Sequence, residues 1–220
     1  PVSSATHAPV SSATHAPVSS ATHAPVPTAS HASEPNAAHA PAGALVQWLS
    51  SGPDRADDTV HALLLSAAWH AQQRLLAVTP YFVPDDALLD AWLSACRRGV
   101  RTTLVVPRRS NHRLADVARE RSLRELVAAG AEVRLAPRMV HAKAVVVDEA
   151  FALCGSVNLD GRSLFLNYEA TAVFYAHEQI DWLARWVASL AASGARHHGR
   201  RVGMARETLE GLVRAVGFQL

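Results

Sequence analysis

Residues 141–158, HAKAVVVDEAFALCGSVN, indicate the fold more clearly than any other part of the sequence. Two mainly apolar runs stand on either side of the triplet Asp148-Glu149-Ala150, which begins with two acidic residues. Short apolar runs separated by a few polar residues are typical of two adjacent strands that are buried in a sheet. We therefore predict strands over residues 141–147 and 151–157, joined by a tight turn.

Polar side chains lie at the ends of these two predicted strands that are away from the turn. His141 and Lys143 are two residues apart, so they share one face of a strand, and the same rule joins Ser156 to Asn158. Glu169 lies on the next predicted strand. We expect an imidazole, an ammonium, a hydroxyl, a carboxamide and a carboxylate to meet at neighbouring strand ends.

This set of groups suits phosphodiester chemistry through a covalent intermediate. A neutral His141 can attack phosphorus and form a phosphohistidine. Lys143 and Asn158 can bind the non-bridging oxygens and stabilise the charge that builds up on them. Glu169 can accept the second imidazole N–H and fix the tautomer. The scheme requires no metal and no cofactor.

The sequence outside this stretch predicts an α/β fold, with a mixed sheet flanked by helices. Helical periodicity alternates with short apolar runs that end at Pro or Gly. The predicted helices cover residues 56–74, 84–98, 114–129, 179–190 and 205–216, and the further strands cover residues 75–79, 102–106, 132–135 and 168–175.

The pattern H-A-K-x4-D over residues 141–148, followed by Gly155-Ser156-Val157-Asn158, resembles the HKD motif of the phospholipase D superfamily. The resemblance implies a phospholipase D-like α/β sandwich. It also implies that His141 is the nucleophile or the general acid, and that Lys143, Ser156 and Asn158 bind the phosphate. Asp148 would be the mainly structural motif aspartate, and Glu169 would orient the histidine.

Further segments are similar to the C-terminal half of bacterial cardiolipin synthases. They carry the sequences SGPD, TPYFVP, RRGV and NLDGRS, at residues 51–54, 79–84, 97–100 and 158–163. This resemblance implies transfer of a phosphatidyl group to glycerol or phosphatidylglycerol. The alternatives are a phospholipase D with water as the acceptor, a nucleic-acid phosphodiesterase of the same superfamily, and an inactive half-domain with a structural role.

Lys143 is the one lysine among 21 cationic residues, so the sequence holds a single HxK pattern. Enzymes of the branch that it resembles carry two HKD motifs, which meet at one active site. We therefore expect the second motif to come from an N-terminal portion outside this sequence or from a homodimer partner. A phospholipid substrate also implies a membrane surface, at the cytoplasmic side of the bacterial inner membrane.

The charge pattern bears on the substrate. The net charge is only +2 with no long basic stripe, which argues against nucleic acid, whose binding needs many phosphate contacts. His112 lies in the basic run Arg108–Arg113. This run is either a solvated loop or a wall of the substrate cleft that attracts an anionic headgroup.

The first 43 residues differ in composition from the rest. The octapeptide PVSSATHA occurs three times in tandem from Pro1 and then degenerates, and the segment is rich in Ala, Ser, Pro and His without an aromatic residue. Such a segment cannot bury a core, so we predict a disordered tail over residues 1–43 and one catalytic domain over residues 44–220.

Overall fold

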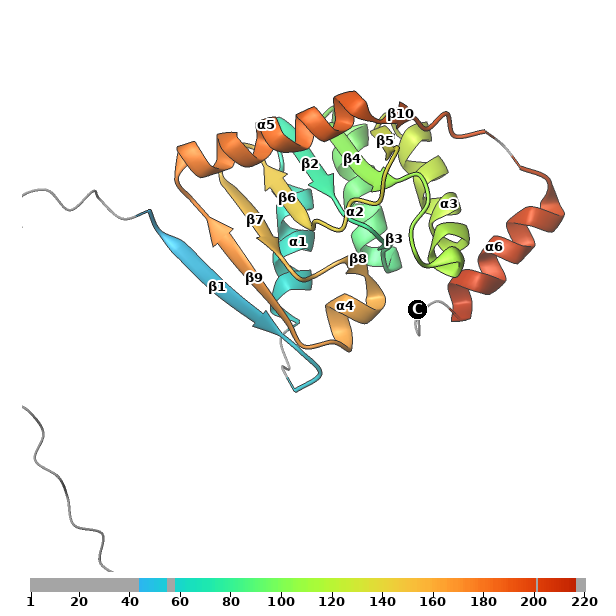
Figure 1. The fold of residues 1–220 in the computed structure, drawn as a ribbon, viewed down its shortest axis with the longest axis horizontal. Coiled ribbons are helices and arrows are strands. Elements are labelled where there is room, and N and C mark those ends of the chain that lie inside the picture. The colour runs from blue at the N-terminus through green and yellow to red at the C-terminus, as the bar shows by residue number, and fades with distance from the viewer. Residues whose placement is uncertain (1–43, 55–57, 201, 217–220) are drawn as a thin grey trace, which may run out of the picture. The chain divides into compact units, whose positions relative to one another are not determined.

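A computed structural model of the protein describes residues 44–54, 58–200 and 202–216 (Figure 1). The predicted repeat tail lies outside the described residues. The strands are β1 (Val46–Ser51), β2 (Arg74–Val78), β3 (Phe82–Val83), β4 (Arg101–Pro107), β5 (Glu132–Ala136), β6 (Ala144–Val147), β7 (Phe151–Gly155), β8 (Leu159–Asp160), β9 (Glu169–Phe174) and β10 (Ala195–Arg196). The helices are α1 (Thr59–His70), α2 (Asp86–Arg97), α3 (Arg113–Ala128), α4 (Gly161–Phe165), α5 (His177–Ser193) and α6 (Met204–Val216).

The predicted α/β fold with a mixed sheet is confirmed. Eight strands form the main sheet in the order β1-β9-β7-β6-β2-β4-β5-β10. The neighbours β2, β4 and β5 run parallel, and the other pairs are antiparallel. β3 and β8 form a separate two-stranded parallel sheet.

Helices cover both faces of the main sheet, and side chains alternate between two cores. Val145 and Val147 of β6 join the core under α1 and α2, whereas Ala144 and Val146 join the core under α5. Figure 1 shows α5 crossing the sheet, with α1 and α2 on the other side. Burial on both faces explains why β2, β4 and β6 are nearly continuous apolar runs in the sequence.

Helix boundaries follow local signals that the sequence carries. Asp85 caps α2, its carboxylate accepting a hydrogen bond from the N–H of Ala87 at 3.2 Å. Gly99, just after the C-cap of α2, adopts φ +88°, a left-handed conformation that glycine takes without strain. The predicted turn after the HKD lysine is also present, between β6 and β7.

Several predicted boundaries are wrong. The strand expected from residue 141 begins at Ala144, and the strand expected to reach residue 157 ends at Gly155. The helix expected over residues 56–74 ends at His70, and Arg74 already starts β2. β1 was not predicted at all. No helix in the described part of the chain is long and apolar enough to cross a bilayer.

Candidate active site

His141 and Lys143 lie in the irregular segment that leads into β6. Lys143 Nζ is 3.1 Å from His141 Nδ1 and 3.2 Å from His141 Nε2, and it donates a hydrogen bond to the His141 carbonyl at 2.8 Å. Because both ring nitrogens are equally near, the ammonium lies against the imidazole and not in line with one lone pair. The two side chains meet as predicted, although the segment that carries them is not a strand.

The electrostatics of Lys143 connect it to two carboxylates. Burial lowers the pKa of Lys143, and the charges of Glu169 and Asp160 oppose that shift in part. Glu169 begins β9 and Asp160 ends β8, so the ammonium lies near the ends of two further strands. A desolvated ammonium has lost water that an anion can replace, which favours a phosphate oxygen as its ligand.

Tyr81 places the second candidate histidine at the same site. The Tyr81 ring packs edge-on against His141, with centroids 6.4 Å apart, and against His112, with centroids 6.3 Å apart. The Tyr81 hydroxyl donates a hydrogen bond to Asn111 Oδ1 at 2.5 Å. His112 therefore stands one aromatic ring away from His141, on the segment that precedes α3.

Ser156 and Asn158 follow β7, but their side chains have different partners. Ser156 Oγ accepts a hydrogen bond from the Ala170 N–H at 3.0 Å, which ties it to β9 beside Glu169. Asn158 Nδ2 donates to Ser163 Oγ at 2.9 Å. Asn158 Oδ1 is buried and has no hydrogen-bond partner within the described residues. A buried oxygen that accepts no hydrogen bond lowers the stability of the fold, so the Oδ1 atom of Asn158 is free to accept a hydrogen bond from a further group.

Glu169 is half-buried at the start of β9, and its Oε1 accepts a hydrogen bond from Asn167 Nδ2 at 3.2 Å. Among the described contacts there is no hydrogen bond between Glu169 and His141. The carboxylate acts on Lys143 through charge. The expected orienting role towards the imidazole remains a prediction.

Asp148 lies at the opposite end of β6 from Lys143. Its carboxylate accepts backbone hydrogen bonds from Gln72 at 2.9 Å, from Gln73 at 2.8 Å and from Arg74 at 2.8 Å. Burial raises the pKa of Asp148, but these bonds and the Arg74 charge outweigh it, so the pKa is lowered overall. The residue adopts φ +50°, a left-handed conformation that Asp tolerates. Its contacts fix the turn after β6 to the start of β2.

Tyr81 was missed in the sequence as a residue of this site, and Asp160 was expected to form a structural ion pair with Arg162 or to contact the substrate. The small sheet explains their position, because Phe82 pairs with Leu159 and Val83 pairs with Asp160. The Asp160 carboxylate caps α4 by accepting a hydrogen bond from the Ser163 N–H at 2.8 Å. Tyr81 lies three residues after the end of β2, which pairs in parallel with β4, and the carboxyl ends of parallel strands are where sites form in α/β sheets. That rule could have indicated it.

No three side chains of His, Cys, Asp or Glu in the described ranges lie close enough together to hold a metal ion.

A family model described as "Cardiolipin synthase, PLD-like domain" matches residues 64–191, more than half of the chain. The chain belongs to this family. The matched part of the PLD-like domain runs from α1 to α5 and includes His141, Lys143, Asp148, Asn158 and Glu169.

Curated relatives fall in the same family. The chain is 41% identical over 133 residues to cardiolipin synthase A of Klebsiella pneumoniae, and 41% identical over 131 residues to cardiolipin synthase A of Escherichia coli O157:H7. The match covers about 60% of this chain but only 27% of either relative. The PLD-like domain therefore corresponds to about a quarter of the relatives' length.

Solved structures share the fold. The phospholipase D family member Nuc from Salmonella typhimurium superposes with a TM-score of 0.59 at 20% identity, over 70% of this chain and 99% of Nuc. Phosphatidylserine synthase from Haemophilus influenzae superposes with a TM-score of 0.62 at 17% identity, over 80% of this chain and 48% of that protein. At these identities the likeness establishes the PLD-like fold and not a substrate.

Proposed function

We propose that the PLD-like domain carries half of an active site that transfers a phosphatidyl group, as in cardiolipin synthesis, through a phosphohistidine on His141. The observation that carries the proposal is the contact between His141 and Lys143. It places a nucleophilic ring nitrogen beside an ammonium that can bind a phosphate oxygen. The family match supports a phospholipid as the substrate.

The first half of the reaction forms the intermediate. An imidazole nitrogen of His141 attacks phosphorus, and the bond from phosphorus to the departing alcohol oxygen breaks. Lys143 stabilises the extra charge on the non-bridging oxygens. Asn158 adds its Nδ2 donor when it leaves Ser163, and Ser156 adds a hydroxyl. The departing oxygen takes a proton from the histidine of the second HKD motif.

The second half of the reaction regenerates His141. The oxygen of the acceptor alcohol attacks phosphorus, its proton passes to the histidine of the second motif, and the phosphorus–nitrogen bond breaks. Glu169 assists by holding the second imidazole N–H. Glycerol or phosphatidylglycerol is the proposed acceptor, and water in its place would make the activity a phospholipase D.

The second HKD motif comes from outside this sequence, since Lys143 is its one lysine. The relatives, which are almost four times as long as the matched segment, favour another part of a longer protein over a second copy of the chain. Phosphatidyl transfer would take place at a membrane surface, on the cytoplasmic side of the bacterial inner membrane, where the lipid substrate lies.

The test uses the protein expressed from the whole open reading frame that encodes this chain, mixed with phosphatidylglycerol vesicles. Formation of cardiolipin and glycerol, abolished by His141→Ala, is the expected result. Phosphatidic acid as the sole product would assign a phospholipase D. Cleavage of single-stranded DNA without any lipid product would assign a nucleic-acid phosphodiesterase. No product with either substrate would favour a structural half-domain and contradict the proposal.

A further inference from the structure

A cluster of arginines lies at the end of the sheet that the proposed chemistry does not use. Arg74 of β2 and Arg101 of β4 are in register on neighbouring parallel strands, so their side chains leave the same face. Arg185 approaches from α5, which covers that face. Like charges directly opposite each other on neighbouring strands repel, so this arrangement costs stability unless an anion offsets it.

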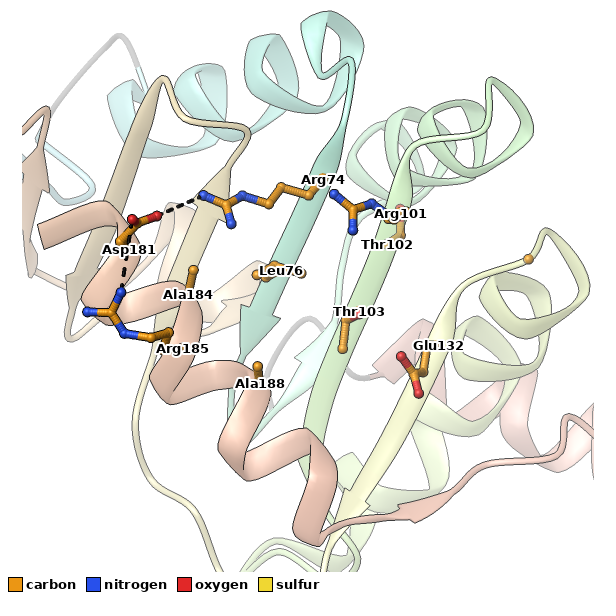
Figure 2. A pocket seen from close by; sticks show the side chains of 11 residues that line it. Arg74, Leu76, Arg101, Thr102, Thr103, Glu132, Asp181, Ala184, Arg185 and Ala188 are labelled. Atoms are coloured by element: carbon orange, nitrogen blue, oxygen red, sulfur yellow. Dashed lines mark ion pairs between the residues drawn. The ribbon is translucent and has the colours of Figure 1, made fainter. Parts of the chain in front are cut away.

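These arginines surround a cavity of about 650 Å³. Figure 2 shows it between α5 and the strands β2, β4 and β5, with Leu76, Thr103 and Ala188 completing the wall. The cavity volume is within the range of small-molecule sites. The space is therefore large enough for a ligand and not only for side-chain packing.

The carboxylates in the wall offset the charge of the arginines only in part. Asp181 is shared, because its Oδ1 is 3.5 Å from Arg74 and its Oδ2 is 4.0 Å from Arg185 and 3.3 Å from His177 Nδ1. Glu132 is paired with Arg134. One carboxylate, Asp181, is thus divided between Arg74, Arg185 and His177, and Glu132 is paired outside the three arginines.

Two guanidinium groups are left without full partners. Arg74 Nη2 is buried and makes no hydrogen bond, its Asp181 contact being too long for one. Arg101 lines the cavity and has no ion pair or hydrogen bond from its side chain among the described contacts, and Figure 2 shows its guanidinium pointing from β4 towards β2. A buried donor without a hydrogen-bond acceptor calls for an explanation, and a bound anion beside Arg74 and Arg101 would supply one.

The cavity is separate from the catalytic residues. It opens at Arg74, the first residue of β2, whereas Lys143 precedes Ala144, which pairs with Val78 at the other end of β2. Four residues of strand correspond to about 13 Å. One ligand phosphate cannot contact both sites, so binding here is a second event.

We propose that the cavity between α5 and β2, β4 and β5 binds a phosphate group through Arg74, Arg101 and Arg185. A guanidinium group can form two parallel hydrogen bonds to the oxygens of a phosphate. The three arginines together carry more positive charge than the one carboxylate of Asp181 can balance. Thr103, next on the same face of β4 after Arg101, adds a hydroxyl. The phosphate belongs either to a soluble phosphorylated molecule or to a lipid headgroup. The proposal does not depend on the phosphatidyl-transfer activity.

The experiment separates this site from the catalytic one by using a Lys143→Ala background, which weakens anion binding beside His141. Pyrophosphate, inorganic phosphate and phosphatidic acid vesicles are titrated into that chain, with and without Arg101→Gln. Arg101→Gln suits the test because the side chain has no described contact to lose. Arg97→Gln, the same charge change at an exposed residue on the opposite face, is the control.

We expect saturable binding that Arg101→Gln weakens about tenfold or more and that Arg97→Gln leaves unchanged. Tighter binding of soluble phosphates assigns a soluble ligand, and tighter binding of the vesicles assigns a lipid headgroup. A second readout needs no variant, because bound pyrophosphate should protect Arg101 of the unaltered chain from an arginine-specific reagent. Equal binding by both variants, or no saturable binding and no protection, would overturn the proposal.

Discussion

The two ends of β6 carry the two parts of one sequence motif, and the structure uses them in opposite ways. At the C-terminal end, both Asp148 carboxylate oxygens are bound by backbone N–H groups. At the N-terminal end, Lys143 is partly desolvated and has only His141 as a described hydrogen-bonding partner. Asp148, whose hydrogen-bond partners all lie within the domain, stabilises the fold. Lys143, which has few such partners, is available to bind a substrate.

The largest expected effect is at His141. His141→Ala removes the proposed nucleophile, so phosphatidyl transfer should fall by about 10⁴-fold or more. The free energy of unfolding should stay within about 0.5 kcal/mol of the unaltered chain, because the ring is exposed. Turnover on vesicles and urea unfolding measure the two quantities. A large loss of stability without loss of turnover would mean that His141 has a structural role and not a catalytic one.

Lys143→Arg asks whether the compact ammonium itself is needed. The positive charge is kept, but the wider guanidinium cannot occupy the same space against the imidazole. We expect turnover to fall by about 10²- to 10³-fold, with little change in stability. Arg138→Lys, a reverse exchange at an exposed position in the segment before His141, is the matched control. Full activity of Lys143→Arg would show that any cation suffices there.

Asp148→Ala should act on stability. Three backbone N–H groups lose their acceptor and the left-handed conformation disfavours alanine, so the free energy of unfolding should drop by about 2–3 kcal/mol. Asp148→Asn keeps one good acceptor and the tolerance for this conformation, so it should lose less. Urea unfolding of both variants is the measurement. If both were as stable as the unaltered chain, Asp148 would not be structural.

The smallest effect concerns pH. The pKa of Asp148 is lowered in the folded chain, so the stability that its charge contributes is present above the unfolded value of about 3.9. It is lost as the pH falls from there through the folded pKa. The stability advantage over Asp148→Asn should therefore narrow between pH 5 and pH 3. An advantage that stayed constant over this range would mean that the charge of Asp148 has no part in it.

The sequence predicted one end of β6 better than the other. The fold class, the helix before Gly99 and the meeting of His141 with Lys143 follow from local patterns, in which the residues concerned are close in the chain. The contacts of Asp148 join residues 74 to 76 positions apart, so no local pattern contains them. The local pattern indicated Asp148 as a turn residue, which is its position, but not that its carboxylate binds the start of β2.

The missed elements have the same cause. β1 is an edge strand with Trp48 exposed. It pairs with β9, which lies near the other end of the domain in the sequence. It therefore lacks the apolar run that marks a buried strand. Tyr81 reaches His141 and His112 only once β2 and β4 are side by side. Aromatic contacts of this kind depend on the tertiary fold.

The position of phosphorus on the protein tests directly whether His141 is the nucleophile. The protein from the whole open reading frame is mixed with phosphatidylglycerol labelled at phosphorus and quenched within the first turnover. If His141 is the nucleophile, label will be found on the peptide that contains His141, lost in acid and kept in base, and absent from His141→Ala. Label on a histidine of the second motif, with turnover intact and none on His141, would contradict the nucleophile assigned to this end of β6.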